Sequence, residues 1–198
     1  MTDEPIPPAT GSVADAYPPP EIAARVCKLG LAKVNTAVPT MVALAVLAGA
    51  FISLGALFYT VTITAGAEGP TLPFGLLRLA GGVTFSLGLI LVVVGGAELF
   101  TGNNLIAMAW AAGCVQTRQV VRNWIWVYLG NLLGACGTAV LVLLAGIQLL
   151  GDGAVGETMV RIARSKIALD PLSAFARGVL CNVLVCLAVW LCMGARSV

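Results

Sequence analysis

The sequence predicts an all-α integral membrane protein in which one of the membrane-spanning helices is broken. Residues 34–67, 123–151 and 178–195 carry no charge, and residues 79–117 carry only Glu98. A helix needs about 20 mostly apolar residues to cross a bilayer, so each run is long enough or nearly so. The whole chain is 59% hydrophobic and 10% charged, whereas soluble domains contain about a quarter charged residues.

The composition also argues against several classes of function. No basic stripe with interleaved aromatic residues is present, so no nucleic-acid partner is expected. The chain contains no histidine, which removes the commonest metal ligand and the usual catalytic proton carrier. The six cysteines form no CxxC pair and are interpreted as small buried hydrophobic residues. We therefore expect neither an enzyme nor a bound metal or other cofactor.

The N-terminal part of the chain is predicted to contain two segments that do not cross the membrane. Residues 1–20 are rich in proline and small residues, which predicts a disordered tail. In residues 21–35, Ile22, Val26 and Leu29 recur at helical spacing among basic side chains. This pattern predicts an amphipathic helix, and either a position at the membrane interface or a solvated lead-in to the first span fits it.

Three uninterrupted spans are predicted next, over residues 38–64, 120–150 and 172–193. Residues 151–170 hold most of the charges of the second half and are interpreted as a loop between the last two spans. Small residues within the spans are expected to let helices approach each other closely. The best candidates are Gly49, Ser53, Gly55, Gly130 and Gly134.

The second span is predicted over residues 74–111 and cannot be one straight helix. Thirty-nine residues separate Arg78 from Arg118, which is nearly twice the length required for one crossing. Glycines and asparagines near residues 96–104 favour an interruption there. Two full spans joined by a turn, and one span broken by a loop, both fit. An ionisable group at membrane depth makes this segment the candidate pore or binding site.

Five stretches of the chain carry a resemblance to a known family. Residues 85–91 (FSLGLIL) and 96–103 (GAELFTGN) resemble the second-helix signature of the formate/nitrite transporter family. Residues 123–135 resemble its third helix and residues 178–190 its fourth, while Ala48 to Ile52 fits the first. The stretches occur in the family's order, and the resemblance extends over nearly the whole chain.

The resemblance implies an aquaporin-like helical bundle that assembles as a homopentamer in the lipid bilayer. Each protomer would hold a passive or proton-coupled pore for a small monovalent anion such as formate, nitrite or hydrosulfide. The family's second helix is broken by a loop, which favours that solution here. The protein is then expected in the plasma membrane. With a broken second span, the side of the membrane that holds the N-terminus carries six basic residues and the other side carries five, so the positive-inside rule places the N-terminus in the cytoplasm.

The resemblance also assigns roles to residues of the pore. Leu99, Phe100 and Thr101 would form the cytoplasmic constriction, and Phe85 and Leu89 would line the periplasmic one. Apolar constrictions exclude hydrated ions, because a bare anion pays a large desolvation cost there. The hydroxyl of Thr101 could donate a hydrogen bond to a passing anion.

Three polar residues complete the predicted site. Lys166 and Asn182 match the family's lysine and asparagine near the central anion site, where a positive charge lowers the cost of anion entry. Glu98 is interpreted as a loop anchor rather than a pore carboxylate, since buried carboxylates are normally bound by structural donors.

The resemblance accounts for four of the family's six spans. The fifth span, the sixth span, and the central histidine with its neighbouring glutamate have no counterpart in this sequence. One half of such a repeat fold cannot enclose a pore, because the site lies between the repeats. The expectation is therefore a channel of which this chain is a fragment, the product of an interrupted reading frame, or one half that pairs with a separately encoded second half. The alternative is a truncated, non-transporting membrane remnant or an assembly subunit.

Overall fold

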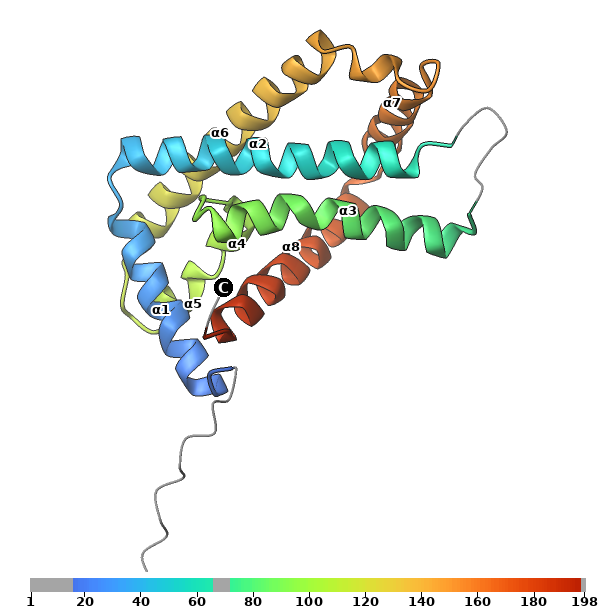
Figure 1. The fold of residues 1–198 in the computed structure, drawn as a ribbon. Helices are drawn as coiled ribbons and strands as arrows, with labels where there is room; N and C mark the ends of the chain where they lie inside the picture. Colours follow the sequence, from blue (N-terminus) through green and yellow to red (C-terminus); the bar gives the residue numbers. More distant parts are fainter. Residues whose placement is uncertain (1–15, 66–71, 197–198) are drawn as a thin grey trace, which may run out of the picture.

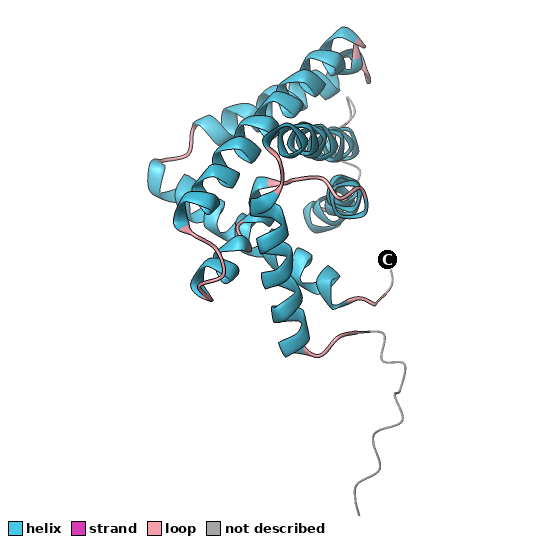
Figure 2. Cartoon of the chain, turned by 90° about the vertical axis from the view of Figure 1, so that its left-hand side faces the viewer, coloured by secondary structure: helices cyan, strands magenta, loops and turns pink. Residues whose placement is uncertain are grey.

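The computed structural model describes residues 16–65 and 72–196, which form helices joined by short connections (Figures 1 and 2). Four helices of this described part are long and apolar enough to cross a membrane. They are α2 (Val38–Ile63), α3 (Phe74–Val94), α6 (Thr117–Leu144) and α8 (Pro171–Gly194). Shorter helices lie at their ends, as the predicted all-α bundle requires.

The second span is one crossing interrupted by a loop. Helix α3 ends at Val94, and the chain continues through Gly96, whose φ of 64° suits glycine, into α4 (Phe100–Asn103) and α5 (Ile106–Ala111). The beginning of α3 lies beside the end of α2, where Gly81 packs against Ile63. We call residues 95–104 the break loop.

The far end of the interrupted span lies at the opposite end of α2. After α5, the chain enters α6, where the Arg122 side chain donates a hydrogen bond of 2.6 Å to the carbonyl of Val34, shortly before α2 begins. The segment therefore crosses the bundle instead of turning back as a hairpin. Of the two solutions that the spacing allowed, the structure has the broken helix (Figure 1).

Helix α2 is the central element, because α3 and α6 both pack along it. Gly49 and Gly134 bring α2 and α6 so close that a Cβ on either glycine would overlap a carbonyl oxygen of the opposite helix. Gly55 and Gly88 bring α2 and α3 together in the same manner. Small residues at such crossings let helix backbones approach without cavities.

The N-terminal helix α1 (Pro19–Asn35) begins within the segment predicted as a tail. Proline fits the first turn of a helix, because its missing N–H has no partner there. Ile22, Val26 and Val34 are buried on one face, and α1 contacts α5, α6 and α8. Residues 1–15 of the predicted tail lie outside the described residues.

The connection between the last two spans differs from the predicted loop. Helix α6 ends at Leu144 and not near residue 150. Gly146, with a φ of 70°, then turns the chain into the short 3-10 helix η1 (Ile147–Leu149). Residues 151–170 then contain helix α7 (Ala154–Ile167). The expectation of a loop was wrong because most of the charges of this segment lie on an amphipathic helix that buries Val155 and Thr158.

Helix α8 lies at the edge of the bundle. Over its most apolar stretch, none of its residues is buried within the described chain. Large side chains such as Leu180 and Leu184 are more than half exposed there. Helix α8 contacts α1 and α4, so it reaches the rest of the bundle both at the N-terminal helix and at the break loop.

Candidate functional site

Hydrogen bonds with α2 and α6 hold the backbone of the break loop in place. Asn131 on α6 donates from Nδ2 to the carbonyls of Ala45 and Glu98, both at 2.8 Å. Its Oδ1 accepts a hydrogen bond of 2.9 Å from the backbone N–H of Phe100. The N–H of Glu98 also reaches the carbonyl of Leu44 at 3.2 Å. One amide side chain therefore satisfies backbone groups that a broken helix would leave unpaired at membrane depth.

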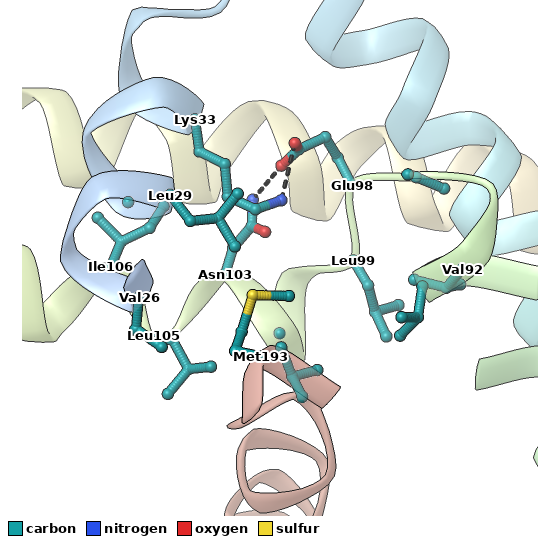
Figure 3. A pocket seen from close by; sticks show the side chains of 16 residues that line it. Val26, Leu29, Lys33, Val92, Glu98, Leu99, Asn103, Leu105, Ile106 and Met193 are labelled. Carbon is teal, nitrogen blue, oxygen red and sulfur yellow. Dashed lines mark hydrogen bonds and ion pairs between the residues drawn. The ribbon is translucent and has the colours of Figure 1, made fainter. Parts of the chain in front are cut away.

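The carboxylate of Glu98 is buried and fully engaged. Lys33 on α1 donates to Oε1 at 2.8 Å, and the Asn103 amide donates to Oε2 at 2.6 Å (Figure 3). The same Asn103 amide donates to Oδ1 of Asn123 at 2.9 Å. Because Glu98, Asn103 and Asn123 are each at most 5% exposed, these bonds replace the water that a carboxylate otherwise requires.

The aromatic ring of Phe100 packs against the bundle. It makes edge-to-face contacts with Trp124, at a centroid distance of 6.4 Å, and with Tyr128, at 5.5 Å. It also packs on the buried cluster of Met41, Ala45 and Val127. Such aromatic pairs add to the energy of burial, so this ring helps to fix the break loop on α6.

The opposite side of the break loop faces α8. Asn104 donates to Oδ1 of Asn182 at 2.8 Å. The thiol of Cys186, one turn further along α8, donates to the carbonyl of Thr101 at 3.4 Å. These two hydrogen bonds join α8 to the break loop at membrane depth.

A cavity of about 200 Å³ lies between α1, the break loop and the end of α8. Its walls are mostly apolar and include Leu29, Leu99 and Met193, while Lys33 and Glu98 supply the polar part (Figure 3). The cavity is large enough for a few waters or a small ion. Cavities of this kind, with a few convergent polar groups, are typical ligand sites.

The sequence profile of the formate/nitrite transporter family matches residues 20–198. The chain belongs to the formate/nitrite transporter family. This match covers all the spans described above, including the break loop and its contacts.

Individual members of the family agree with this assignment. The chain is 43% identical over 151 residues to the formate channel FocA of Haemophilus influenzae, across 76% of this chain and 52% of that relative. It is 44% identical over 154 residues to FocA of Escherichia coli strain K12, across 78% of this chain and 53% of that one. The chain thus spans about half the length of the curated relatives it matches.

A solved structure gives the same result for the fold. A pentameric formate channel with formate bound matches with a TM-score of 0.72 at 43% identity, across 81% of this chain and 62% of that chain. The prediction of an all-α membrane fold with a broken second span is therefore confirmed, and the chain is a multi-pass membrane protein.

The break loop brings together several residues that the sequence predicted for the transporter site, but not all of them. Glu98 and Leu99 line the cavity, and Thr101 contacts α8 beside Asn182. Phe85 and Leu89 lie one turn apart on α3 and do not line this cavity. Lys166 lies exposed on α7, and its ammonium forms no hydrogen bond or ion pair within the described residues.

Sequence reasoning missed the polar partners that hold the break loop. Lys33 was interpreted only as part of an amphipathic helix, although it forms the ion pair with Glu98. Asparagines inside apolar spans are costly unless bonded, and this signal could have found Asn123 and Asn131. The remaining partners, Asn103 and Asn104, lie in the predicted interruption itself.

Proposed function

We propose that this chain forms part of a channel for small monovalent anions such as formate or nitrite, with the break loop as its constriction. The observation that carries the proposal is a membrane span interrupted by a loop that borders a cavity of about 200 Å³. Hydrogen bonds from Lys33 on α1 and Asn131 on α6 hold the carboxylate and the backbone of this loop. Irregular backbone at membrane depth is tolerated where it is buried in protein or lines a wet cavity. Membership of the formate/nitrite transporter family supports the anion as cargo.

Apolar side chains would exclude hydrated ions at two constrictions. Leu99 and Phe100 would serve at the cytoplasmic one, with the Thr101 hydroxyl as a hydrogen-bond donor to the anion. Phe85 and Leu89 would narrow the periplasmic one. The contacts of Phe100 with α6 support a role in fixing the wall of the constriction.

Charge would then select anions over cations. Lys166 lies on α7, at the end of the bundle opposite α1, where its ammonium would attract anions and lower the cost of their desolvation. Asn182 would supply an amide near the central site. The hydrogen bonds of Glu98 to Lys33 and Asn103 support its role as a loop anchor.

Flux measurement tests the proposal. The chain would be reconstituted in lipid vesicles and the uptake of radiolabelled formate and of nitrite measured against empty vesicles. Thr101→Val keeps the shape but removes the hydroxyl, so we expect flux to fall about fivefold or more. Thr62→Val is the matched control, because the Thr62 hydroxyl bonds only within its own helix, to the carbonyl of Phe58. Flux no higher than in empty vesicles would refute the proposal for this chain.

We further propose a homopentamer in the plasma membrane with the N-terminus in the cytoplasm. Cys114 is exposed on the connection between α5 and α6, at the same end of the bundle as α1. A membrane-impermeant thiol reagent added to intact cells should leave Cys114 unlabelled and should label it in inverted vesicles, with Cys114→Ser as the control. Native mass spectrometry of the purified protein measures the number of subunits.

A further inference from the structure

Helix α8 presents one narrow stripe to the break loop. Asn182, Cys186 and Val189 follow each other at spacings of four and three residues, which places them on one face of the helix. Each touches the break loop or a neighbour in the stripe: Asn182 binds Asn104, Cys186 binds Thr101, and Val189 lies against Gly102. All three side chains are half-buried, although the rest of α8 is largely exposed.

The polar part of this stripe is a connected chain of hydrogen bonds. The Asn104 amide donates to Oδ1 of Asn182 at 2.8 Å, and Nδ2 of Asn182 donates to Sγ of Cys186 at 3.6 Å. The Cys186 thiol donates in turn to the carbonyl oxygen of Thr101 at 3.4 Å. The chain of bonds starts and ends on the break loop, three residues apart, so Asn182 and Cys186 together clamp that stretch of backbone.

The thiol has a specific task within this clamp. Helix α4 has only four residues, and the carbonyls at the end of a helix have no helical partner. The structure gives the Thr101 carbonyl such a partner in Cys186. An unpaired carbonyl at membrane depth is costly, so the thiol stabilises one orientation of the Thr101 peptide.

We propose that Cys186 is a positioning residue that sets the place of Thr101 in the constriction and thereby the preference of the channel among small anions. The proposal rests on the proposed anion-channel function, because selectivity has meaning only if the chain conducts. Cys186 acts through the backbone of Thr101 and does not itself touch the anion. A thiol is a weak donor, so the clamp holds the loop without locking it.

Amide hydrogen exchange tests the clamp without any measurement of transport. In Cys186→Ala, exchange of the backbone amides of residues 101–105 should become about two- to fivefold faster, the change expected for loss of one weak hydrogen bond. Cys186→Ser retains a donor and should restore slow exchange. The matched control is Cys181→Ala, because Cys181 lies exposed on the same helix. Unchanged exchange in Cys186→Ala would overturn the clamp.

Selectivity tests the consequence of the clamp. The ratio of formate to nitrite flux should change about two- to fivefold in Cys186→Ala, return toward that of the wild type in Cys186→Ser, and stay unchanged in Cys181→Ala. Faster exchange with an unchanged ratio would overturn the role in anion preference. A wild-type chain that conducts neither anion would overturn the proposed function and this role in selectivity, while the exchange measurement still decides whether the clamp exists.

Discussion

The two sides of the break loop are held in very different ways. On the side of α1, α2 and α6, an ion pair and several asparagine amides bind the loop, and Asn103 and Asn123 are almost completely buried. On the side of α8, one amide pair and one thiol make the polar contacts, all from half-buried side chains. The first side therefore holds the loop with more numerous and more deeply buried polar contacts, while the second is the side that we propose to set the position of Thr101.

The largest effect is expected from breaking the ion pair on the strongly held side. Lys33→Met leaves the Glu98 carboxylate, whose side chain is 7% exposed, without its cation. The free energy of unfolding should fall by about 3 kcal/mol, as for other buried pairs that lose one partner. Denaturant unfolding in detergent measures the change.

A matched lysine and a double variant sharpen this test. Lys28→Met on the same helix should change the stability by less than about 0.5 kcal/mol, because Lys28 is exposed. Adding Glu98→Gln to Lys33→Met should recover part of the loss, since it removes the unpaired charge. Equal losses for the two lysine variants would contradict an anchoring role for the pair.

Removal of the amide that suspends the loop should have the next largest effect. Asn131→Ala deprives the N–H of Phe100 and the carbonyls of Ala45 and Glu98 of their partner. Three hydrogen bonds are lost, and hydrogen bonds within membranes contribute less than about 1 kcal/mol each on average, so we expect the free energy of unfolding to fall by about 2 kcal/mol. Asn35→Ala is the control, since Asn35 is exposed. Thermal unfolding of both variants measures the difference, and similar midpoints would contradict the assignment.

Two adjacent asparagines allow a direct comparison of the two sides. Asn103 binds Glu98 and Asn123 on the strongly held side, whereas Asn104 binds Asn182 on α8. Asn104→Ala should lower the free energy of unfolding by roughly 0.6 kcal/mol. Asn103→Ala should lower it by about 1–2 kcal/mol more, because this variant also leaves a buried carboxylate with one donor fewer. Parallel unfolding titrations measure both, and equal losses would show that the two sides hold the loop equally.

Much of the fold follows from apolar run lengths, but the partners of the site do not. The charge-free runs predicted the crossings of α2, α6 and α8, and the glycines around Glu98 predicted the break. The pairing of Glu98 with Lys33 joins residues 65 positions apart. It depends on how α1 packs and rotates against the break loop, which a local pattern does not encode.

The helix in the connection before α8 could not be predicted from the local sequence pattern either. Segment 151–170 contains six charged residues, and charge density alone predicts a loop. The burial of Val155 and Thr158 that makes α7 a helix depends on contacts with α2 and η1. The same holds for Asn182, which the resemblance linked to the anion site, because its hydrogen bond to Asn104 becomes visible only when α8 meets the break loop.

The smallest expected effect concerns the start of α8 on the weakly held side. Asp170 caps this helix, and its carboxylate accepts a hydrogen bond of 3.0 Å from the N–H of Ser173. The hydrogen bonds from the side chain and backbone of Ser173 lower the pKa of Asp170 below its ordinary value. A lowered pKa in the folded state means that the charged cap stabilises the protein above the unfolded pKa, about 3.9. This contribution is lost as the pH falls through the lower folded value.

Asp170→Asn isolates this pH dependence. Asparagine still caps a helix but carries no charge, so the thermal midpoint of the variant should lack the part of the acid dependence that Asp170 supplies. The difference from the wild type should stay constant between about pH 5 and pH 7 and shrink below about pH 4. Ser173→Ala should raise the pKa of Asp170 and move the loss to a higher pH. A parallel acid profile for Asp170→Asn and the wild type would show that the charge of Asp170 contributes nothing to the stability of the protein.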